Sequence, residues 1–118
     1  MSTLEQVLTG VREHPGVEHV LLLGRDGLLI QHLGGAAGLD TETTSAVVPE
    51  IASACEQLGA AGSLGEFATA VIEYDGHVAI ILSLSADLLL AVLLHDDVGF
   101  ATLLRNLRSR REYFASLI

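Results

Sequence analysis

Residues 17–33 read VEHVLLLGRDGLLIQHL, with an Asp-Gly pair between two runs of aliphatic and β-branched residues. Residues 67–84 read FATAVIEYDGHVAIILSL and repeat this arrangement around a second Asp-Gly pair. Asp and Gly at the centre of a tight turn tolerate the positive φ angles of a type I′ turn, so each pair predicts a hairpin. We therefore expect a chain built around antiparallel strands.

The apolar runs beside these turns predict four strands, and a fifth follows a Ser-Ala-Asp turn. The expected strands cover residues 17–23, 28–33, 67–74, 78–84 and 88–94. The last of them reads LLLAVLL without alternating polar residues, so both of its faces are expected to be covered. The sheet is thus predicted to be the middle of three layers.

Three helices are expected around the sheet. The first begins with a capping-box pattern at Ser2 and Glu5. The second runs from a cap at Asp40 to about Gly59, and the third opens at the acidic pair of residues 96 and 97. The predicted order is α-β-β-α-β-β-β-α, an α/β sandwich of the α+β class that forms a single domain over residues 1–118.

The second helix carries two apolar stripes. The stripe expected to face the sheet consists of Val47, Ile51, Ala54 and Leu58. A stripe of smaller residues, which would let another helix approach closely, consists of Val48, Ala52, Cys55 and Gly59. Pro49 removes the hydrogen bond to the carbonyl of Ser45, at a cost of about 3 kcal/mol in a helix interior. The segment is therefore expected to be kinked or divided into two helices.

Composition excludes several classes of protein. Half of the 118 residues are hydrophobic, and 15 carboxylates against six Arg and no Lys give a net charge of -9. This balance argues against nucleic-acid binding, which needs clustered positive charge. A single cysteine, Cys55, excludes an internal disulfide and a Cys-based zinc module, and it suits the cytoplasm. We expect neither a secretory signal nor membrane insertion, because no basic start precedes an apolar run and no long apolar stretch follows.

No catalytic or cofactor-binding constellation stands out in the sequence. The glycine-rich stretch at residues 34–38 cannot form a nucleotide-hydrolysing P-loop, because the chain has no lysine. The stretch at residues 62–65 lacks the spacing of a nucleophile elbow. Five histidines (His14, His19, His32, His77 and His95) occur without a His-x-His or His-x3-His pair. We therefore expect surface or capping roles for them and no metal site, no cofactor and no enzymatic activity.

Motifs along the whole chain resemble those of the Roadblock (dynein light chain) family. They are Pro15-Gly16-Val17 before the first strand, residues 26–30 after the first turn, the Ala/Ser-rich second helix, residues 71–74 before the second turn, and Val98-Gly99 at the last helix. The resemblance implies a profilin-like fold with a five-stranded antiparallel sheet of order 2-1-5-4-3. It places helix two on one face and helices one and three on the other.

The resemblance also implies a homodimer, in which the third strands pair edge to edge and the second helices pack together. The interface residues that it implies are Val48, Ala52, Cys55, Gly59, Phe67, Thr69 and Val71. Prokaryotic members of the family look like partners of Ras-like small GTPases, including a gliding-motility regulator that stimulates GTP hydrolysis. Such members bind the GTPase on the platform of the paired second helices.

In this chain, the platform would consist of Glu42, Ser45, Pro49, Ser53 and Glu56. The second helix contains no Arg, so it cannot supply an arginine finger. The expected function is a homodimeric regulator or scaffold for a small GTPase. Two alternatives are a dimeric sensor that binds a small ligand, because fold does not fix function, and an acid–base enzyme that uses His95 with Asp96 or Asp97.

Overall fold

The computed structural model describes residues 3–35, 38–96 and 99–117. Its elements in chain order are α1 (Leu4–Arg12), β1 (Val17–Gly24), β2 (Leu29–Gly34), α2 (Thr41–Gly62), β3 (Thr69–Glu73), β4 (His77–Ser83), β5 (Leu88–His95), α3 (Ala101–Ser109) and α4 (Arg111–Ser116). The predicted order is confirmed, except that the last helix is interrupted at Arg110 and continues as α4. None of the helices in the described part of the chain is long and apolar enough to cross a membrane.

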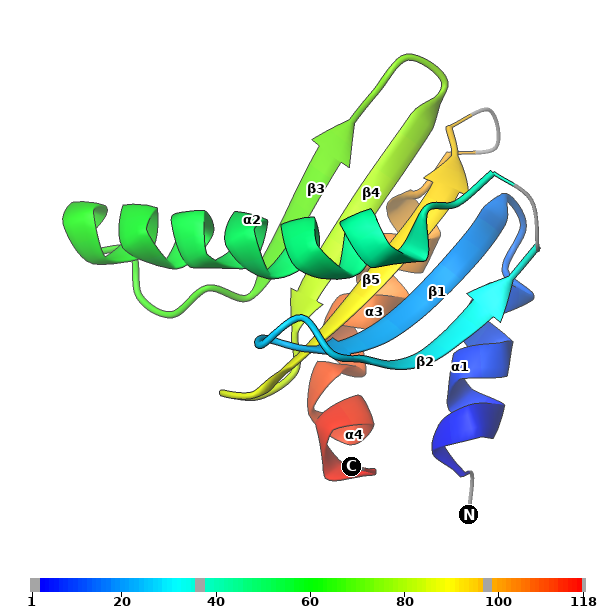
Figure 1. Cartoon of the computed structure of the whole chain (residues 1–118), viewed down its shortest axis with the longest axis horizontal. Coiled ribbons are helices and arrows are strands. Elements are labelled where there is room, and N and C mark those ends of the chain that lie inside the picture. The colour runs from blue at the N-terminus through cyan, green and yellow to red at the C-terminus, as the bar shows by residue number, and fades with distance from the viewer. Residues whose placement is uncertain (1–2, 36–37, 97–98, 118) are drawn as a thin grey trace.

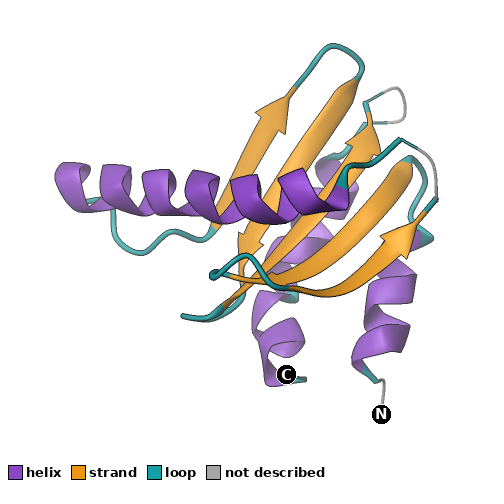
Figure 2. Ribbon diagram, viewed as in Figure 1, coloured by secondary structure: helices purple, strands orange, loops and turns teal. Residues whose placement is uncertain are grey.

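The five strands form one antiparallel sheet in the order β2-β1-β5-β4-β3, as the resemblance implied. Helix α2 crosses one face, and α1, α3 and α4 lie on the other (Figures 1 and 2). Strand β5 lies in the centre, where side chains on both of its faces are buried, so its unbroken apolar run is explained.

The two faces of the sheet bury apolar cores of different composition. Leu8 of α1, Leu107 of α3 and Phe114 of α4 pack with large aliphatic side chains of the sheet. Beneath α2 the core is smaller, and the helix contributes Val48 and Ala52 as its buried members. The fold therefore depends mainly on the α1, α3 and α4 side, while α2 lies close to the sheet through small side chains.

Both Asp-Gly pairs form hairpin turns, but the predicted turn type is wrong. Only the glycines have positive φ, 89° at Gly27 and 85° at Gly76, whereas a type I′ turn needs positive φ at both central residues. In the first turn, the Leu28 amide donates to Asp26 Oδ1 at 3.0 Å. An aspartate that accepts such a bond stabilises the turn from a conformation with negative φ.

Helix α1 begins one residue later than predicted. Thr3 is its N-cap, with Thr3 Oγ1 accepting from the Gln6 amide at 3.2 Å and the Thr3 amide donating to Gln6 Oε1 at 2.9 Å. Ser2, the predicted cap, lies outside the described residues. Thr and Gln form the same reciprocal capping box as Ser and Glu, so the sequence contains two possible capping boxes that are one residue apart.

Of the N-caps predicted for the other two helices, the one for α2 is confirmed and the one for α3 is wrong. Asp40 caps α2 as predicted, because its Oδ1 accepts from the Thr43 amide at 3.0 Å. Hydrogen bonds from the Thr43 amide and hydroxyl hold the pKa of Asp40 below its ordinary value. The predicted cap at residues 96 and 97 is wrong for α3, whose N-cap is Phe100 without a side-chain hydrogen bond. Asp97 lies outside the described residues.

The two stripes of α2 divide differently from the prediction, although Ile51 packs against the core beneath the helix as predicted. Val48 and Ala52 are only 6% and 0% exposed and pack on the sheet beside Leu21. Val47 and Leu58, predicted to face the sheet, are 40% and 65% exposed. The prediction ranks the stripes by side-chain size, whereas small residues are what allow a helix to approach a surface closely.

Gly59 belongs to the same buried stripe. A Cβ atom there would stand 3.0 Å from the carbonyl oxygen of Gly65, so the glycine admits the loop that leaves α2. Val48, Ala52 and Gly59 are thus occupied by contacts within their own chain, and their assignment to a dimer contact is corrected. Cys55 is half-buried.

Pro49 neither divides α2 nor ends it, because the helix is continuous from Thr41 to Gly62. Proline has no amide hydrogen for the carbonyl of Ser45. That carbonyl oxygen would stand 3.4 Å from a Cβ on Gly27, so the first hairpin turn approaches α2 at its weakened point. The first hairpin turn therefore lies close to α2 at Gly27, where a Cβ would be in van der Waals contact with the helix.

Candidate functional site

A groove of about 530 Å³ lies between the outer face of α2 and the β1–β2 turn. Its lining residues are Arg25, Asp26 and Gly27 of the turn and Glu42, Ala46, Pro49, Glu50 and Ser53 of the helix. Three of these residues are carboxylates and one is a guanidinium. The groove is therefore acidic, and it runs along the part of α2 where Pro49 replaces a helical hydrogen-bond donor.

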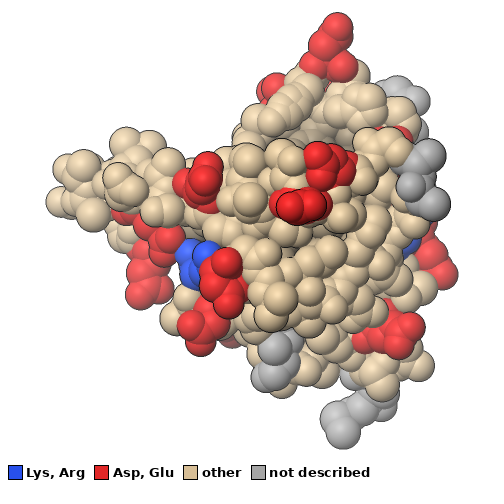
Figure 3. All heavy atoms as spheres, in the orientation of Figure 1, with Lys and Arg blue, Asp and Glu red and all other residues tan. Residues whose placement is uncertain are grey.

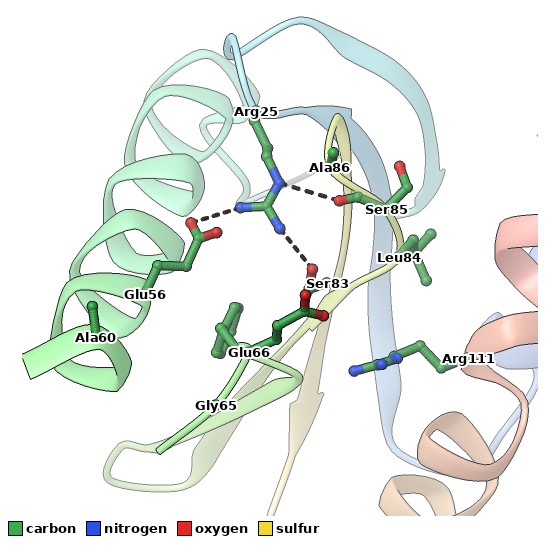
Figure 4. A pocket seen from close by; sticks show the side chains of 11 residues that line it. Arg25, Glu56, Ala60, Gly65, Glu66, Ser83, Leu84, Ser85, Ala86 and Arg111 are labelled. Atoms are coloured by element: carbon green, nitrogen blue, oxygen red, sulfur yellow. Dashed lines mark hydrogen bonds and ion pairs between the residues drawn. The ribbon is translucent and has the colours of Figure 1, made fainter. Parts of the chain in front are cut away.

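The guanidinium of Arg25 is committed to contacts within the chain (Figure 4). Its Nη1 donates to Glu56 Oε1 at 2.8 Å, its Nη2 to Ser83 Oγ at 2.6 Å, and its Nε to the Ser85 carbonyl at 3.3 Å. Arg25 thereby ties the first turn to α2 and to the β4–β5 turn. The arginine beside the groove is a structural brace, and it is not free to enter a partner.

A hollow of about 440 Å³ lies next to this brace, between α2 and the end of β4. Figure 4 shows Arg111 pointing into it, with Glu66 on the other side. The guanidinium groups of Arg25 and Arg111 are matched there by the carboxylates of Glu56 and Glu66. The hollow has no excess positive charge, so it does not favour an anionic ligand such as a phosphate.

The face that carries α2 is mostly acidic or uncharged. In Figure 3, Asp and Glu atoms are spread over this face, whereas Lys or Arg atoms show only in a small cluster and at one edge. The sequence of α2 contains three Glu and no Arg or Lys. A partner that binds here would complement it with positive charge.

The C-terminal end of α2 projects beyond the edge strand β3 (Figure 1). We call this end of the helix together with the two residues that follow it, residues 58–64, the α2 arm. Leu58 and Leu64 are 65% and 70% exposed on it. Strand β3 is hydrogen-bonded to β4 on one side only, and its Val71 is 37% exposed. An apolar arm beside a free strand edge is the kind of surface that proteins usually cover.

Comparison with known families decides the identity of the fold. Residues 3–94, which run from α1 through most of β5, match the model described as Roadblock/LC7 domain. The chain belongs to this family. No curated protein sequence matches the chain closely enough to narrow the relationship.

Solved structures of bacterial Roadblock proteins share the fold. The gliding protein MglB of Thermus thermophilus is 16% identical and superposes with a TM-score of 0.85, covering 97% of this chain and 87% of its own. MglB of Myxococcus xanthus is 17% identical with a TM-score of 0.81, covering 97% and 89%. A Roadblock/LC7 domain of Streptomyces avermitilis is 21% identical with a TM-score of 0.71, covering 92% and 97%. At these identities the likeness establishes a common architecture.

The residues predicted to bind a GTPase separate into three groups in this Roadblock domain. Glu42, Pro49 and Ser53 line the acidic groove together. Ser45 is only 6% exposed, so the prediction that it faces outward is wrong. Glu56 is exposed but is paired with Arg25. Position along the helix could not reveal that pairing, because Arg25 comes from a distant turn.

Of the three residues predicted to lie on the edge strand, two do so and one does not. Thr69 and Val71 lie on β3 as expected. Phe67 precedes the strand and is partly buried against the core beneath α2, so it packs within its own chain. The predicted strand begins too early because an aromatic side chain is typical of strands and of cores alike.

Sequence reasoning missed a cluster formed by Glu18, His77 and His95. Glu18 Oε1 lies 3.2 Å from His77 Nε2, and Glu18 Oε2 lies 3.1 Å from His95 Nε2. The two histidines are direct partners in the β4–β5 ladder. They are equidistant in sequence from Ala86 in the turn, so a hairpin centred there would have predicted the pair. His77 and His95 lie at the surface as expected, but the fold brings them together, and the partner of His95 is Glu18.

A second pair, His19 and His32, joins β1 to β2. His19 Nδ1 and His32 Nε2 are 3.0 Å apart, so one ring donates a proton and the other accepts it. Burial lowers the pKa of His19 below its ordinary 6.5, and positive charge on His32 and Arg12 lowers it further against an opposing effect of Glu18. The fold therefore favours the neutral form of His19.

This shift predicts a loss of stability on the acid side. Unfolded His19 takes up a proton near pH 6.5 but folded His19 does so only at lower pH, so its contribution to the unfolding free energy falls as pH drops below 6.5. Wild-type protein should lose more stability between pH 7 and the acid range than His19→Gln. Urea denaturation at each pH in metal-free buffer measures the difference. Parallel pH profiles for the two proteins would contradict the assignment.

Proposed function

We propose that this Roadblock domain is a homodimeric regulator of a Ras-like small GTPase in the cytoplasm, and that it acts by binding and not as an enzyme itself. The observation that carries the proposal is the acidic groove at Pro49, on the outer face of α2. Family membership supports it, as does the common fold with two MglB proteins, one of which is named a gliding protein.

The proposed dimer uses the exposed flank of α2 together with the edge of β3. Val47 and Leu58 give the flank an apolar surface, and the α2 arm extends past the edge strand β3. A second copy related by a twofold axis would place its own β3 beside this strand and beneath this arm. That arrangement would cover the free strand edge and the exposed flank of α2 in each copy, so we assign this flank to the dimer in place of the buried stripe.

The groove would remain open in such a dimer, because it lies on the side of α2 that faces the β1–β2 turn. Its carboxylates suit a basic region of a GTPase surface. Arg25 of the β1–β2 turn is held by Glu56 and Ser83, and α2 itself contains no Arg or Lys, so an inserted arginine is not the proposed device. Any stimulation of hydrolysis would come from ordering the catalytic groups of the GTPase.

Charge reversal in the groove tests the proposal. Glu42→Lys with Glu50→Lys should weaken binding to the proposed Ras-like GTPase partner by at least about tenfold and alter its salt dependence, because complementary charges speed encounter and fix register. Glu56 is left intact to preserve the Arg25 brace. Binding to the GDP-bound and GTP-analogue-bound forms is measured by calorimetry at two salt concentrations.

The matched control is Glu13→Lys with Glu112→Lys, which changes net charge equally at exposed positions outside α2. This control should bind like the wild type, and both double variants should remain dimers in sedimentation. If both double variants bound the GTPase equally weakly, the change in overall charge would explain the effect and the groove would not. If the groove variant bound the GTPase as tightly as the wild type, the groove would not be part of the interface.

A further inference from the structure

The cluster of Glu18, His77 and His95 is assembled from three neighbouring strands. Strand β5 lies between β1 and β4, so residues at corresponding heights on the three strands stand side by side. His77 and His95 are direct ladder partners, and Val17 and His19 pair with Leu94 and Leu93. The ligating atoms of the cluster all lie within 4.8 Å of one another.

A β-bulge places Glu18 in this cluster. The β1–β5 register shifts between Val17 and His19, so Glu18 is an extra residue without a ladder partner. Bulges redirect a side chain that regular pleating would send to the other face. Hydrogen bonds on both sides hold the adjoining backbone, from the His95 amide to the Gly16 carbonyl at 2.9 Å and from the Tyr74 amide to the His77 carbonyl at 2.7 Å.

The spacing of the cluster matches the coordination shell of a small divalent ion. Imidazole nitrogen and carboxylate oxygen ligands lie about 2.0–2.2 Å from Zn²⁺, which puts tetrahedral ligand atoms roughly 3.3 Å apart. The two carboxylate oxygens of Glu18 stand 3.2 and 3.1 Å from the two Nε2 atoms. Both rings therefore direct Nε2 toward the carboxylate of Glu18, one to each oxygen.

Accessibility and ligand chemistry narrow the choice of ion. The three side chains are between about one-third and one-half exposed, so an ion can enter and a water can complete its shell. A hollow of about 320 Å³ also borders Glu18 and His77. Imidazole ligands select zinc-like transition metals, whereas Mg²⁺ and Ca²⁺ require oxygen ligands.

We propose that Glu18, His77 and His95 form a binding site for a zinc-class divalent ion, with a fourth position open to water. Such an ion joins β1, β5 and β4 at one end of the sheet. It replaces two imidazole–carboxylate contacts with three coordinate bonds. The site is independent of the acidic groove, so GTPase binding and metal binding can fail separately.

Calorimetric titration of chelator-treated full-length protein with ZnCl₂ tests the site. We expect one ion per chain, and His77→Gln, His95→Gln and Glu18→Gln should each weaken binding by at least about tenfold, the range already seen when only supporting groups are removed. Titration with Co²⁺ should give the visible absorption of nitrogen and oxygen coordination, and His95→Gln should abolish it. Circular dichroism checks that each variant is folded.

Two histidine variants outside the cluster serve as controls. His14→Gln removes an imidazole near α1, and His32→Gln removes one member of the other histidine pair; both should bind zinc like the wild type. Absence of binding below millimolar zinc would overturn the proposal, as would unchanged affinity in His95→Gln. Loss in His32→Gln without loss in His95→Gln would also overturn it, because the ion would then belong to the His19–His32 pair.

Discussion

Ala52→Glu is expected to unfold the domain or to leave it barely stable. Ala52 is fully buried between α2 and the sheet, where its neighbours are aliphatic side chains such as Leu21 and Leu89. An uncompensated charge at such a position costs on the order of 3–5 kcal/mol or more. Domains of this size have a total stability of about 5–15 kcal/mol. Urea denaturation followed by far-ultraviolet circular dichroism measures the loss.

Ala46→Glu is the matched control on the same helix. Ala46 is exposed, so its glutamate stays in water, with the like charges of Glu42 and Glu50 one turn away. Such pairs cost a few tenths of a kcal/mol. If Ala52→Glu were as stable as Ala46→Glu and merely monomeric, the small stripe would face a second chain and the burial described above would be wrong.

The wrong assignment of Val47, Val48, Ala52 and Leu58 on α2 shows what a single sequence leaves undecided. Both stripes of the helix are apolar, and periodicity alone assigns each of them to some buried surface. The chain places Val48 and Ala52 against its own sheet and leaves Val47 and Leu58 for solvent or a partner. The two surfaces differ in how closely they can approach a neighbour, because small side chains permit a closer approach. How close the approach is depends on the neighbouring strands, which the helix sequence does not describe.

Local signals predicted the strands well. An Asp-Gly pair and the apolar run of β5 act over a few residues, so they survive in any tertiary context. Their strand order could not be derived from periodicity and came from the family resemblance. Element ends were less secure: Thr3 replaced Ser2 as a cap because neighbouring residues offered equivalent bonds.

The candidate sites depend on contacts between distant residues. Glu42, Pro49 and Ser53 were predictable because one helical face brings them together. The brace between Arg25 and Glu56 was not, since it joins a turn to a helix. The position of Glu18 depends on a bulge in β1, and no residue type in the sequence marks that bulge.

Leu58→Glu is expected to raise the dissociation constant of the proposed dimer by at least about 100-fold. Leu58 is 65% exposed on the α2 arm, and a twofold interface would bury two introduced carboxylates at once. Each buried, unpaired charge costs several kcal/mol, and 1.4 kcal/mol corresponds to a tenfold change in affinity. The folded monomer should tolerate the change, because the new side chain stays in water. Sedimentation equilibrium across a range of protein concentrations measures the constant.

Leu28→Glu is the control, because Leu28 is also 65% exposed but lies in the β1–β2 turn, away from the arm and from β3. Both variants lose one exposed leucine and gain one charge, so their solubility and net charge change equally. Only Leu58→Glu should become monomeric at micromolar concentration. If both variants stayed dimeric, the arm would not lie in the interface. If Leu28→Glu alone dissociated, the second copy would bind at the β2 edge of the sheet, and the unpaired edge of β3 would then be free to receive a different partner.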